Sequence, residues 1–474
     1  MMRKQLLGLI ACVLGSITFV FAADDTAYLT LAEAPDAGIY LPAPPDTASV
    51  HFATDVWTWQ YGKTLRPTPR GEQASIESMW SAEEMMRILS EALETTVSDQ
   101  QTPAIARFVR RLSATAHWAP YAAKKKYMRV RPFARMNEHL TSAYDDETAL
   151  RHNGSYPSGH TSLGWLVALG MTEVVPERAD TILRRGFQYG EDRWIVGAHW
   201  RSDVQAGYLC SSATWARAHA NPVYYEDLKA AREEWQRIGS QPSALSPQMA
   251  ELPVPDGLRI METPIDTASF LFYDDIMGYY EGKALRGTAA GQRAIQGAAK
   301  KTKDLMRYFS PAVDIAISKE ETPALYALLD YGHDYLKRCV RSIKSSHPRK
   351  RPYVQFGEPT LIPELEREEG MTESFPSGHS ARGWGFALML AEVMPECANA
   401  LLATGYEYGY DRVVAGYHYL SDVQSARLVA SYAVAYLHTD AEFCRLMDEA
   451  KKEYGLKKNP PKKDKQNNKN KKNK

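Results

Sequence analysis

Residues 124–203 contain three short motifs: Lys124-x6-Arg131-Pro132, Pro157-Ser158-Gly159-His160 and Arg193-x5-His199-x3-Asp203. Residues 344–422 contain the same three in the same order: Lys344-x6-Arg351-Pro352, Pro376-Ser377-Gly378-His379 and Arg412-x5-His418-x3-Asp422. Each set supplies three cations, a turn suited to opening a helix, two histidines and a carboxylate. These residue types predict a site that binds a phosphate group and transfers it, and their recurrence predicts two such sites.

The repeat extends well beyond the motifs. Thr102-Pro103-Ala104 matches Thr322-Pro323-Ala324 at an offset of 220 residues, and the offset becomes 219 after the Arg-Pro pair. A period this long is that of a whole domain, because solenoid repeats are far shorter. The length of 474 residues is also enough for two cores. We therefore expect two domains, residues 23–243 and 244–456, joined in the Ser- and Pro-rich segment 239–256.

Helix signals dominate each copy. Ser81 and Glu84 fit a capping box, and Thr102 with Pro103 fits the start of another helix. An apolar segment follows the Pro-Ser-Gly-His motif and runs to Pro176, while alternating strand patterns are scarce. The predicted fold is all-α, with two tandem helical domains and the motifs at helix starts and in connecting loops.

The two ends of the chain differ from its body. Arg3 and Lys4 precede a mostly apolar run that ends in Val20-Phe21-Ala22, which is typical of a secretory signal at 1–22. A retained membrane anchor and lipidation at Cys12 are the alternatives. Residues 457–474 carry nine Lys and one Asp with almost nothing apolar. We expect a disordered tail there, either solvated or attracted to an anionic surface.

The body between these ends is acidic, with 46 Lys and Arg against 56 Asp and Glu. Cations around a bound anion must therefore be placed locally, and we expect no nucleic-acid partner. No later stretch reaches the length of a membrane span, so we predict a periplasmic or secreted protein without integral membrane association. An oxidising compartment permits disulfides, but the pairing stays open for the four remaining cysteines: Cys210, Cys339, Cys397 and Cys444.

The cations suggest how a phosphate is held. Arg131 and Arg193 can each offer a planar fork to phosphate oxygens, and Lys124 offers a point charge. If residues 124–131 are helical, a spacing of seven puts Lys124 and Arg131 on one face. Because no His, Asp or Cys cluster occurs at metal-ligand spacing, we predict no metal and no other cofactor.

The other two motifs supply donors and a nucleophile. Gly159 permits a close approach of backbone to ligand, the free N–H groups of a helix start bind anions, and Ser158 can donate its hydroxyl. If their segment is helical, His199 and Asp203 share a face, and the carboxylate can fix one ring nitrogen as the donor. Spacing alone leaves open how the roles divide between His160 and His199.

These residues resemble the superfamily of type 2 phosphatidic acid phosphatases and vanadium-dependent haloperoxidases, whose signature is Lys-x6-Arg-Pro, Pro-Ser-Gly-His and Ser-Arg-x5-His-x3-Asp. Residues 40–45, 65–71 and 197–203 look like the class A bacterial nonspecific acid phosphatases, which are secreted, soluble and helical. The resemblance implies a metal-independent acid phosphatase that hydrolyses phosphate monoesters through a phosphohistidine, with one site per domain. Vanadate is expected to inhibit it, and we expect the two domains to form an internal pseudo-dimer.

The resemblance also implies a role for each motif residue. His199 and His418 would be the nucleophiles, Asp203 and Asp422 would orient them, and His160 and His379 would protonate the leaving alcohol. The phosphoryl oxygens would be held by Lys124, Arg131, Ser158, Gly159 and Arg193, and in the second copy by Lys344, Arg351, Ser377, Gly378 and Arg412.

One position departs from the family signature. Asp192 and Asp411 stand where the family has Ser, directly before the arginine of the third motif. A carboxylate facing a phosphate would repel it. Each aspartate must therefore turn away, pair with a cation or be protonated.

Two other functions are weighed against the acid phosphatase. A vanadate-dependent haloperoxidase would use the same oxyanion pocket, but such enzymes are usually longer between motifs than the 26 residues that separate Arg131 from Pro157. A lipid or diphosphate phosphatase, with one domain serving only as a scaffold, is the other. Membrane lipid phosphatases place transmembrane segments where this insert is short, and neither copy lacks a catalytic residue.

Overall fold

The computed structural model describes residues 26–238 and 252–458, which fold as helices and loops without a named strand. The first half contains α1 (Ala37–Tyr40), α2 (Val50–Leu65), α3 (Pro69–Ile76), α4 (Ala82–Leu93), α5 (Pro103–Ala116), α6 (Tyr121–Tyr127), α7 (Pro132–Arg135), α8 (Glu147–Arg151), α9 (Gly159–Val174), α10 (Ala179–Ile195), α11 (Arg201–Ala218) and α12 (Pro222–Ile238). The second contains α13 (Gly257–Ile260), α14 (Phe272–Ala284), α15 (Ala289–Gln296), α16 (Thr302–Phe309), α17 (Pro323–Ser346), α18 (Pro352–Phe356), α19 (Glu366–Glu369), α20 (Gly378–Val393), α21 (Ala398–Ala415), α22 (Leu420–Leu437) and α23 (Ala441–Lys458). The predicted all-α class is confirmed.

The helix starts follow the sequence signals. Ser81 caps α4 by accepting a hydrogen bond from the Glu84 N–H at 3.0 Å. Thr102 and Pro103 open α5 as predicted, although the Thr102 side chain bonds to Ser98 instead of capping the helix. Ser158 caps α9, so the Pro-Ser-Gly-His motif does open the apolar helix.

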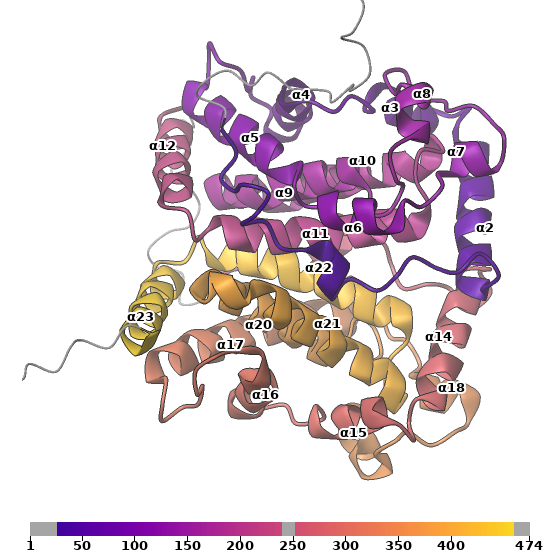
Figure 1. The fold of residues 1–474 in the computed structure, drawn as a ribbon, viewed down its shortest axis with the longest axis vertical. Coiled ribbons are helices and arrows are strands. Elements are labelled where there is room, and N and C mark those ends of the chain that lie inside the picture. The colour runs from indigo at the N-terminus through magenta and orange to yellow at the C-terminus, as the bar shows by residue number, and fades with distance from the viewer. Residues whose placement is uncertain (1–25, 239–251, 459–474) are drawn as a thin grey trace, which may run out of the picture.

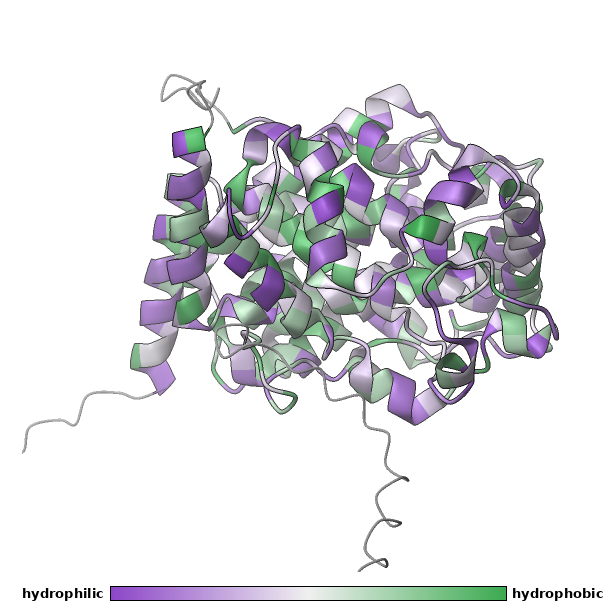
Figure 2. Cartoon of the chain, turned by 90° about the horizontal axis from the view of Figure 1, so that it is seen from above, coloured by the Kyte–Doolittle hydropathy of each residue, from purple (hydrophilic) through white to green (hydrophobic). Residues whose placement is uncertain are grey.

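Each half is built around one central helix. Every residue of α9 is buried, and α5, α10 and α11 surround it. Helix α20 takes the same place in the second half, with α17, α21 and α22 around it. Figure 2 shows hydrophilic residues gathered on the outer faces and hydrophobic residues inside. Because α9 and α20 are enclosed, residues at their first turns are held rigidly.

The two halves pack through reciprocal contacts. Helix α9 contacts α22 just as α11 contacts α20, and α1 contacts α21 just as α13 contacts α10. Helices α11 and α22 also meet each other in the middle of the molecule, as do α2 and α14 at one edge (Figure 1). In a twofold interface, each helix of one half makes the contact that its counterpart makes in the other half, and these contacts follow that pattern. It agrees with the expected internal pseudo-dimer.

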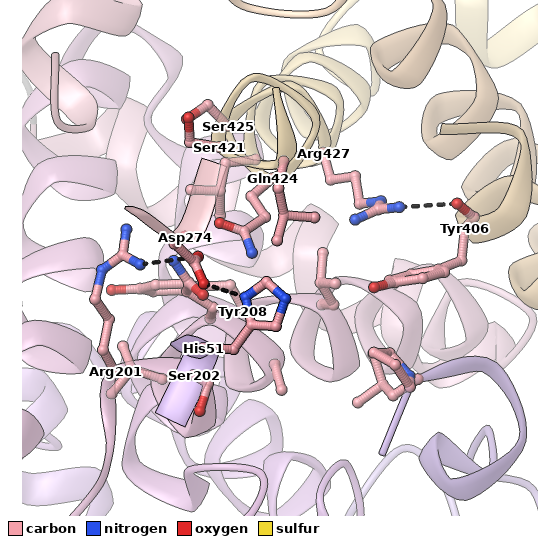
Figure 3. A pocket seen from close by; sticks show the side chains of 18 of the residues that line it. His51, Arg201, Ser202, Tyr208, Asp274, Tyr406, Ser421, Gln424, Ser425 and Arg427 are labelled. Carbon is pink, nitrogen blue, oxygen red and sulfur yellow. Dashed lines mark hydrogen bonds and ion pairs between the residues drawn. The ribbon is translucent and has the colours of Figure 1, made fainter. Parts of the chain in front are cut away.

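Polar side chains and one large hydrophobic cluster join the halves. The Trp384 indole N–H donates to Ser212 Oγ at 3.3 Å, and buried residues of both halves form one continuous core cluster. His51 Nδ1 lies 2.5 Å from Asp274 Oδ1 across the interface, and this hydrogen bond raises the pKa of His51 to about 9. The pair lines a cavity of about 620 Å³ between the halves, together with Arg201 (Figure 3). None of the predicted site residues lines this cavity.

Several sequence-based expectations fall outside the described residues. These are the signal at 1–22, the domain boundary at 243/244 and most of the tail. Helix α23 continues to Lys458, so the first two residues of the predicted tail are helical. Within the described part of the chain no helix is both long and apolar enough to cross a bilayer. The four cysteines, Cys210, Cys339, Cys397 and Cys444, are all unpaired.

Candidate active site

The three motifs of the first half meet at the start of α9. Ser158, at the N-cap, donates its backbone N–H to the Asp203 carbonyl at 2.9 Å, which joins the second and third motifs. Arg131 NH1 lies 2.9 Å from His199 Nε2, which joins the first and third. The second half repeats both contacts, at 3.1 Å and 2.9 Å. All three motifs therefore contribute to a single pocket in each half.

Residues 124–131 do not form one continuous helix, so the condition for placing Lys124 and Arg131 on one helix face is not met. Helix α6 ends at Tyr127, Met128 takes a left-handed conformation with φ 42°, and the chain is extended at Arg131. A following proline disfavours the helical conformation, which accounts for the extended Arg131. The two cations still converge, because Lys124 Nζ and Arg131 both donate to the carbonyl of Gly154. In the second half α17 likewise ends before Arg351.

His199 and Asp203 do not share a helix face either, because only Asp203 lies in a helix. His199 lies in the turn before α11, whose N-cap is Trp200. Asp203 reaches back from the first turn: its Oδ2 accepts the Trp200 N–H at 2.8 Å and lies 3.6 Å from His199 Nδ1. The pair is close because a helix-start carboxylate caps the turn that carries the histidine. His418 and Asp422 are 3.6 Å apart in the same arrangement.

The hydrogen bond from Arg131 decides which ring nitrogen of His199 is unprotonated. A guanidinium only donates, so His199 Nε2 must accept and the ring proton must sit on Nδ1, facing Asp203. Burial and the Arg131 charge hold the pKa of His199 well below its usual value, which keeps the ring neutral. Burial and Arg351 likewise lower the pKa of His418 to about 3. Each ring thus presents an unprotonated nitrogen to the pocket, which is what a nucleophile requires.

His160 is oriented differently. It is the second residue of α9, and its Nε2 lies 3.0 Å from the Ser78 carbonyl, which can only accept. The proton on Nε2 is therefore tied to the backbone, and Nδ1 is the nitrogen that can exchange a proton with a ligand. Burial, and then the charge of Arg193, lower the pKa of His160 to about 3. His379 makes the equivalent contact to Ala298 O at 3.1 Å, and its pKa is also lowered.

The arginines of the third motif are buried with unused donors. Arg193 is fully buried, and its Nε and NH1 have no hydrogen-bond partner among the described residues. Arg412 is 1% exposed, and none of its three guanidinium nitrogens has a hydrogen-bond partner within the described part of the chain, although Nη2 lies 3.6 Å from Glu369 Oε1. Burying a guanidinium without hydrogen-bond partners costs free energy. Such a group is therefore expected where a bound ligand supplies the missing acceptors. Planar donors beside Arg131 or Arg351 fit a tetrahedral oxyanion.

Residues 112–225 and 332–443 both match the PAP2 superfamily. A non-specific acid phosphatase of Providencia stuartii is 38% identical over 215 residues, covering 45% of this chain and 86% of that protein. A non-specific acid phosphatase of Salmonella typhimurium is 38% identical over 203 residues, covering 43% and 81%. The chain belongs to the PAP2 superfamily. An acid phosphatase of Zymomonas mobilis is 33% identical over 202 residues, covering 43% and 76%.

This PAP2 protein accommodates the aspartates that replace the family serine. Asp192 forms an ion pair with Arg70, and burial raises the pKa of Asp192 to about 7. Asp411 pairs with Arg293 at 3.0 Å and accepts the Tyr308 hydroxyl at 2.7 Å. Of the three expected solutions, pairing with a cation is therefore found in both halves. The carboxylates leave the cations of the phosphate pocket free.

A second set of PAP2 site residues was missed by the sequence reasoning. Arg129 bridges Asp203 and Asp55, at 2.5 and 2.8 Å, and the Ser155 hydroxyl donates to Asp203. Burial alone would raise the pKa of Asp203, but Arg129 and His199 lower it, so the carboxylate stays charged. The second copy uses the equivalent Arg349, Asp275 and Ser374. The sequence did contain a signal for these residues, because each recurs in both copies. Arg129 and Arg349, for example, both stand first in an Arg-x-Arg-Pro sequence.

A carboxylate of the chain already touches each third-motif arginine. Asp145 Oδ2 lies 2.5 Å from Arg193 Nη2, and Glu369 Oε1 lies 3.6 Å from Arg412 Nη2. Burial would raise the pKa of Asp145, but Arg193 lowers it; Arg412 and Arg351 similarly lower the pKa of Glu369 to about 2. Both side chains are therefore ionised at neutral pH. These carboxylates occupy the side of the arginines that an anionic ligand would use, so a bound anion must displace them.

We expect Asp145→Asn, made in a His418→Ala background, to lower KM for p-nitrophenyl phosphate about three- to tenfold with little change in kcat. The amide no longer competes as an anion for Arg193. Because the folded pKa of Asp145 is depressed, its stabilising contribution is present above the unfolded value of about 4 and is lost as pH falls through the folded value. Steady-state kinetics and melting curves at pH 7 and pH 3 test both effects. An unchanged or higher KM contradicts the competition.

The fold also assembles a His and Glu cluster that spacing did not reveal. Ligand atoms of Glu173, His219 and His438 lie within 4.8 Å of one another, buried between the halves. Glu173 is near the last turn of α9, about 20 Å along the helix from His160 at 1.5 Å per residue. Its carboxylate pairs with His219 at 3.2 Å and accepts the Tyr224 hydroxyl. The cluster joins the halves and lies away from the Lys and Arg side chains of the predicted phosphate pocket.

Proposed function

We propose that this protein is a periplasmic or secreted acid phosphatase that hydrolyses phosphate monoesters at two sites, one in each half. The observation that carries the proposal is the pair of buried guanidiniums, Arg193 and Arg412, whose donors are not all used within the described residues. In the same pockets His199 and His418 each accept a hydrogen bond from a second arginine, Arg131 or Arg351. The names of the relatives support the substrate class.

In the proposed reaction, His199 Nε2 attacks phosphorus and the P–N bond forms as the ester P–O bond breaks. The bound phosphate dianion favours the imidazolium form of His160, whose Nδ1 proton passes to the leaving oxygen and leaves His160 neutral. Neutral His160 then takes a proton from water, whose oxygen attacks phosphorus, and the P–N bond breaks to release phosphate. Asp203 stabilises the positive charge that forms on the His199 ring. His418, His379 and Asp422 carry out the same steps in the second half.

The remaining motif residues bind the phosphoryl group. Arg131 and Arg193 offer forked donors, Lys124 offers a charge, and the first turn of α9 offers backbone N–H groups at Gly159 and beyond. Burial and Arg131 lower the pKa of Lys124, and burial lowers the pKa of Lys344 to about 7. A bound dianion counters that effect and favours the charged amines. Three cations supply charge that a metal ion supplies in other phosphatases.

We expect phosphate release from p-nitrophenyl phosphate at acidic to neutral pH to continue in the presence of a chelator. The general acid must be protonated, and the pKa of His160 is depressed in the empty site, so activity declines as pH rises. Vanadate should inhibit because its five-coordinate adduct resembles the phosphoryl transition state. Loss of activity on chelation, with recovery on adding a divalent ion, would contradict the metal-free mechanism. Rapid bromide oxidation by peroxide with added vanadate would identify a haloperoxidase instead.

A further inference from the structure

The two sites differ on the side where the leaving group must lie. In the first half Trp80 packs against the His160 ring, with centroids 5.2 Å apart and planes at 89°. At the 220-residue offset, the residue equivalent to Trp80 is Lys300. Its Nζ lies 3.1 Å from Glu369 Oε1, the same carboxylate that touches Arg351. An aromatic wall in one site is thus a cation in the other.

A second cation is added in the second half alone. Arg382 lies one turn after His379 on α20, and its counterpart in the first half is the core residue Leu163. Arg382 is 8% exposed, and its guanidinium contacts Gly378 O at 3.1 Å, Lys300 O at 3.4 Å and His333 Nε2 at 3.2 Å. No ion pair of Arg382 is found among the described residues. A buried cation without a counter-ion is costly unless a ligand supplies the charge.

The charge of Arg382 is felt at the reacting group. Burial, then Arg412 and then Arg382, lower the pKa of His379. Glu369 lies among Lys300, Arg351 and Arg412, so a single internal carboxylate faces both the phosphate pocket and the added cation. This one negative charge is shared by more cations than it can neutralise. The second site therefore has spare positive charge beside the general acid.

We propose that Lys300 and Arg382 form a second anion-binding subsite in the second half, which selects monoesters whose leaving group carries another phosphate. The first half has Trp80 in place of Lys300 and the core residue Leu163 in place of Arg382, and it selects leaving groups with an apolar or aromatic surface. This inference rests on the proposed phosphatase function. Hydrolysis follows the same steps as before, and the second phosphate stays on the leaving alcohol, which takes its proton from His379.

The test compares fructose 1,6-bisphosphate with fructose 6-phosphate in the His199→Ala protein, where only the second site turns over, and in His418→Ala. We expect the ratio of the two kcat/KM values to favour the bisphosphate about tenfold more in His199→Ala. Lys300→Trp, which installs the first-half residue at a partly exposed position, should remove that preference in the His199→Ala background. Lys303→Trp, at an exposed cation three residues later in the first turn of α16, is the matched control and should leave the preference intact.

Equal ratios in the two single-site proteins, or a ratio unaffected by Lys300→Trp, would overturn the subsite. Arg382→Leu should act like Lys300→Trp, and the Lys300 variant decides the matter if Arg382→Leu does not fold. Pyrophosphate as a third substrate shows whether the second site prefers a phosphoanhydride or a second phosphate carried on a separate oxygen of the leaving group.

A binding measurement separates this proposal from the reaction itself. Calorimetric titration of the His199→Ala/His418→Ala protein with methylenediphosphonate and with phosphate needs no turnover. We expect Lys300→Trp to weaken diphosphonate binding about tenfold and phosphate binding less. If His199→Ala does not hydrolyse any monoester while this difference persists, the phosphatase function of the second half fails and the subsite stands. Equal weakening of both ligands would overturn the subsite.

Discussion

His199→Ala and His418→Ala should each leave a protein that still hydrolyses p-nitrophenyl phosphate, while the double variant should lose about 10³-fold or more of the activity. Each half contains its own nucleophile, acid and cations, so removal of one nucleophile silences one site. The remaining rate in each single variant then reports the other site alone. Initial rates of the four proteins on several monoesters measure the effect.

The covalent intermediate gives an independent readout. Acid quenching destroys phosphohistidine, so labelled protein should be trapped under alkaline conditions from either single variant and not from the double variant. His139→Ala, at a histidine whose side chain is 91% exposed, is the matched control and should retain full activity. Because one core cluster spans both halves, melting temperatures must show that the variants stay folded. If a folded single variant loses all turnover, the halves are not independent.

Arg193→Ala in the His418→Ala background should lower kcat/KM by about 10³-fold, or about 4 kcal/mol of transition-state stabilisation. Arg193 is fully buried, and its Nε and Nη1 have no hydrogen-bond partner within residues 26–238 and 252–458, so these donors can bind phosphoryl oxygens. A water molecule in the truncated site cannot replace a fixed, charged fork. Steady-state kinetics with p-nitrophenyl phosphate provide the measurement.

Two further variants sharpen this experiment. Arg193→Lys keeps the charge but loses the planar fork, so we expect it to recover only part of the lost rate. Arg184→Ala, on the same α10 helix and beside Phe187, removes a guanidinium outside the pocket and should change kcat/KM less than twofold. A loss below about tenfold for Arg193→Ala would mean that the phosphate lies elsewhere.

The sequence by itself determined the architecture and the residues of the proposed chemistry. The spacing within each motif is the same in both copies, and the offset between the copies changes only from 220 to 219 residues, so the repeat shows that these spacings are not chance. Local signals were equally direct: Ser158 caps α9 and Pro103 opens α5, because capping and proline geometry act within a few residues of the chain. The spacing between Lys124 and Arg131 did not determine the local structure there, since Pro132 and the turn at Met128 interrupt the helix.

Only the tertiary structure decided which groups surround those residues. Arg129 reaches Asp55, 74 positions away, and Glu369 reaches Lys300, 69 positions away, through loops whose path no spacing rule predicts. The pairing of Asp192 with Arg70 and the meeting of His219 with His438 between the halves depend likewise on how whole helices pack. Such contacts are long-range and arise from burial of helix faces, whereas sequence patterns report mainly on neighbours along the chain.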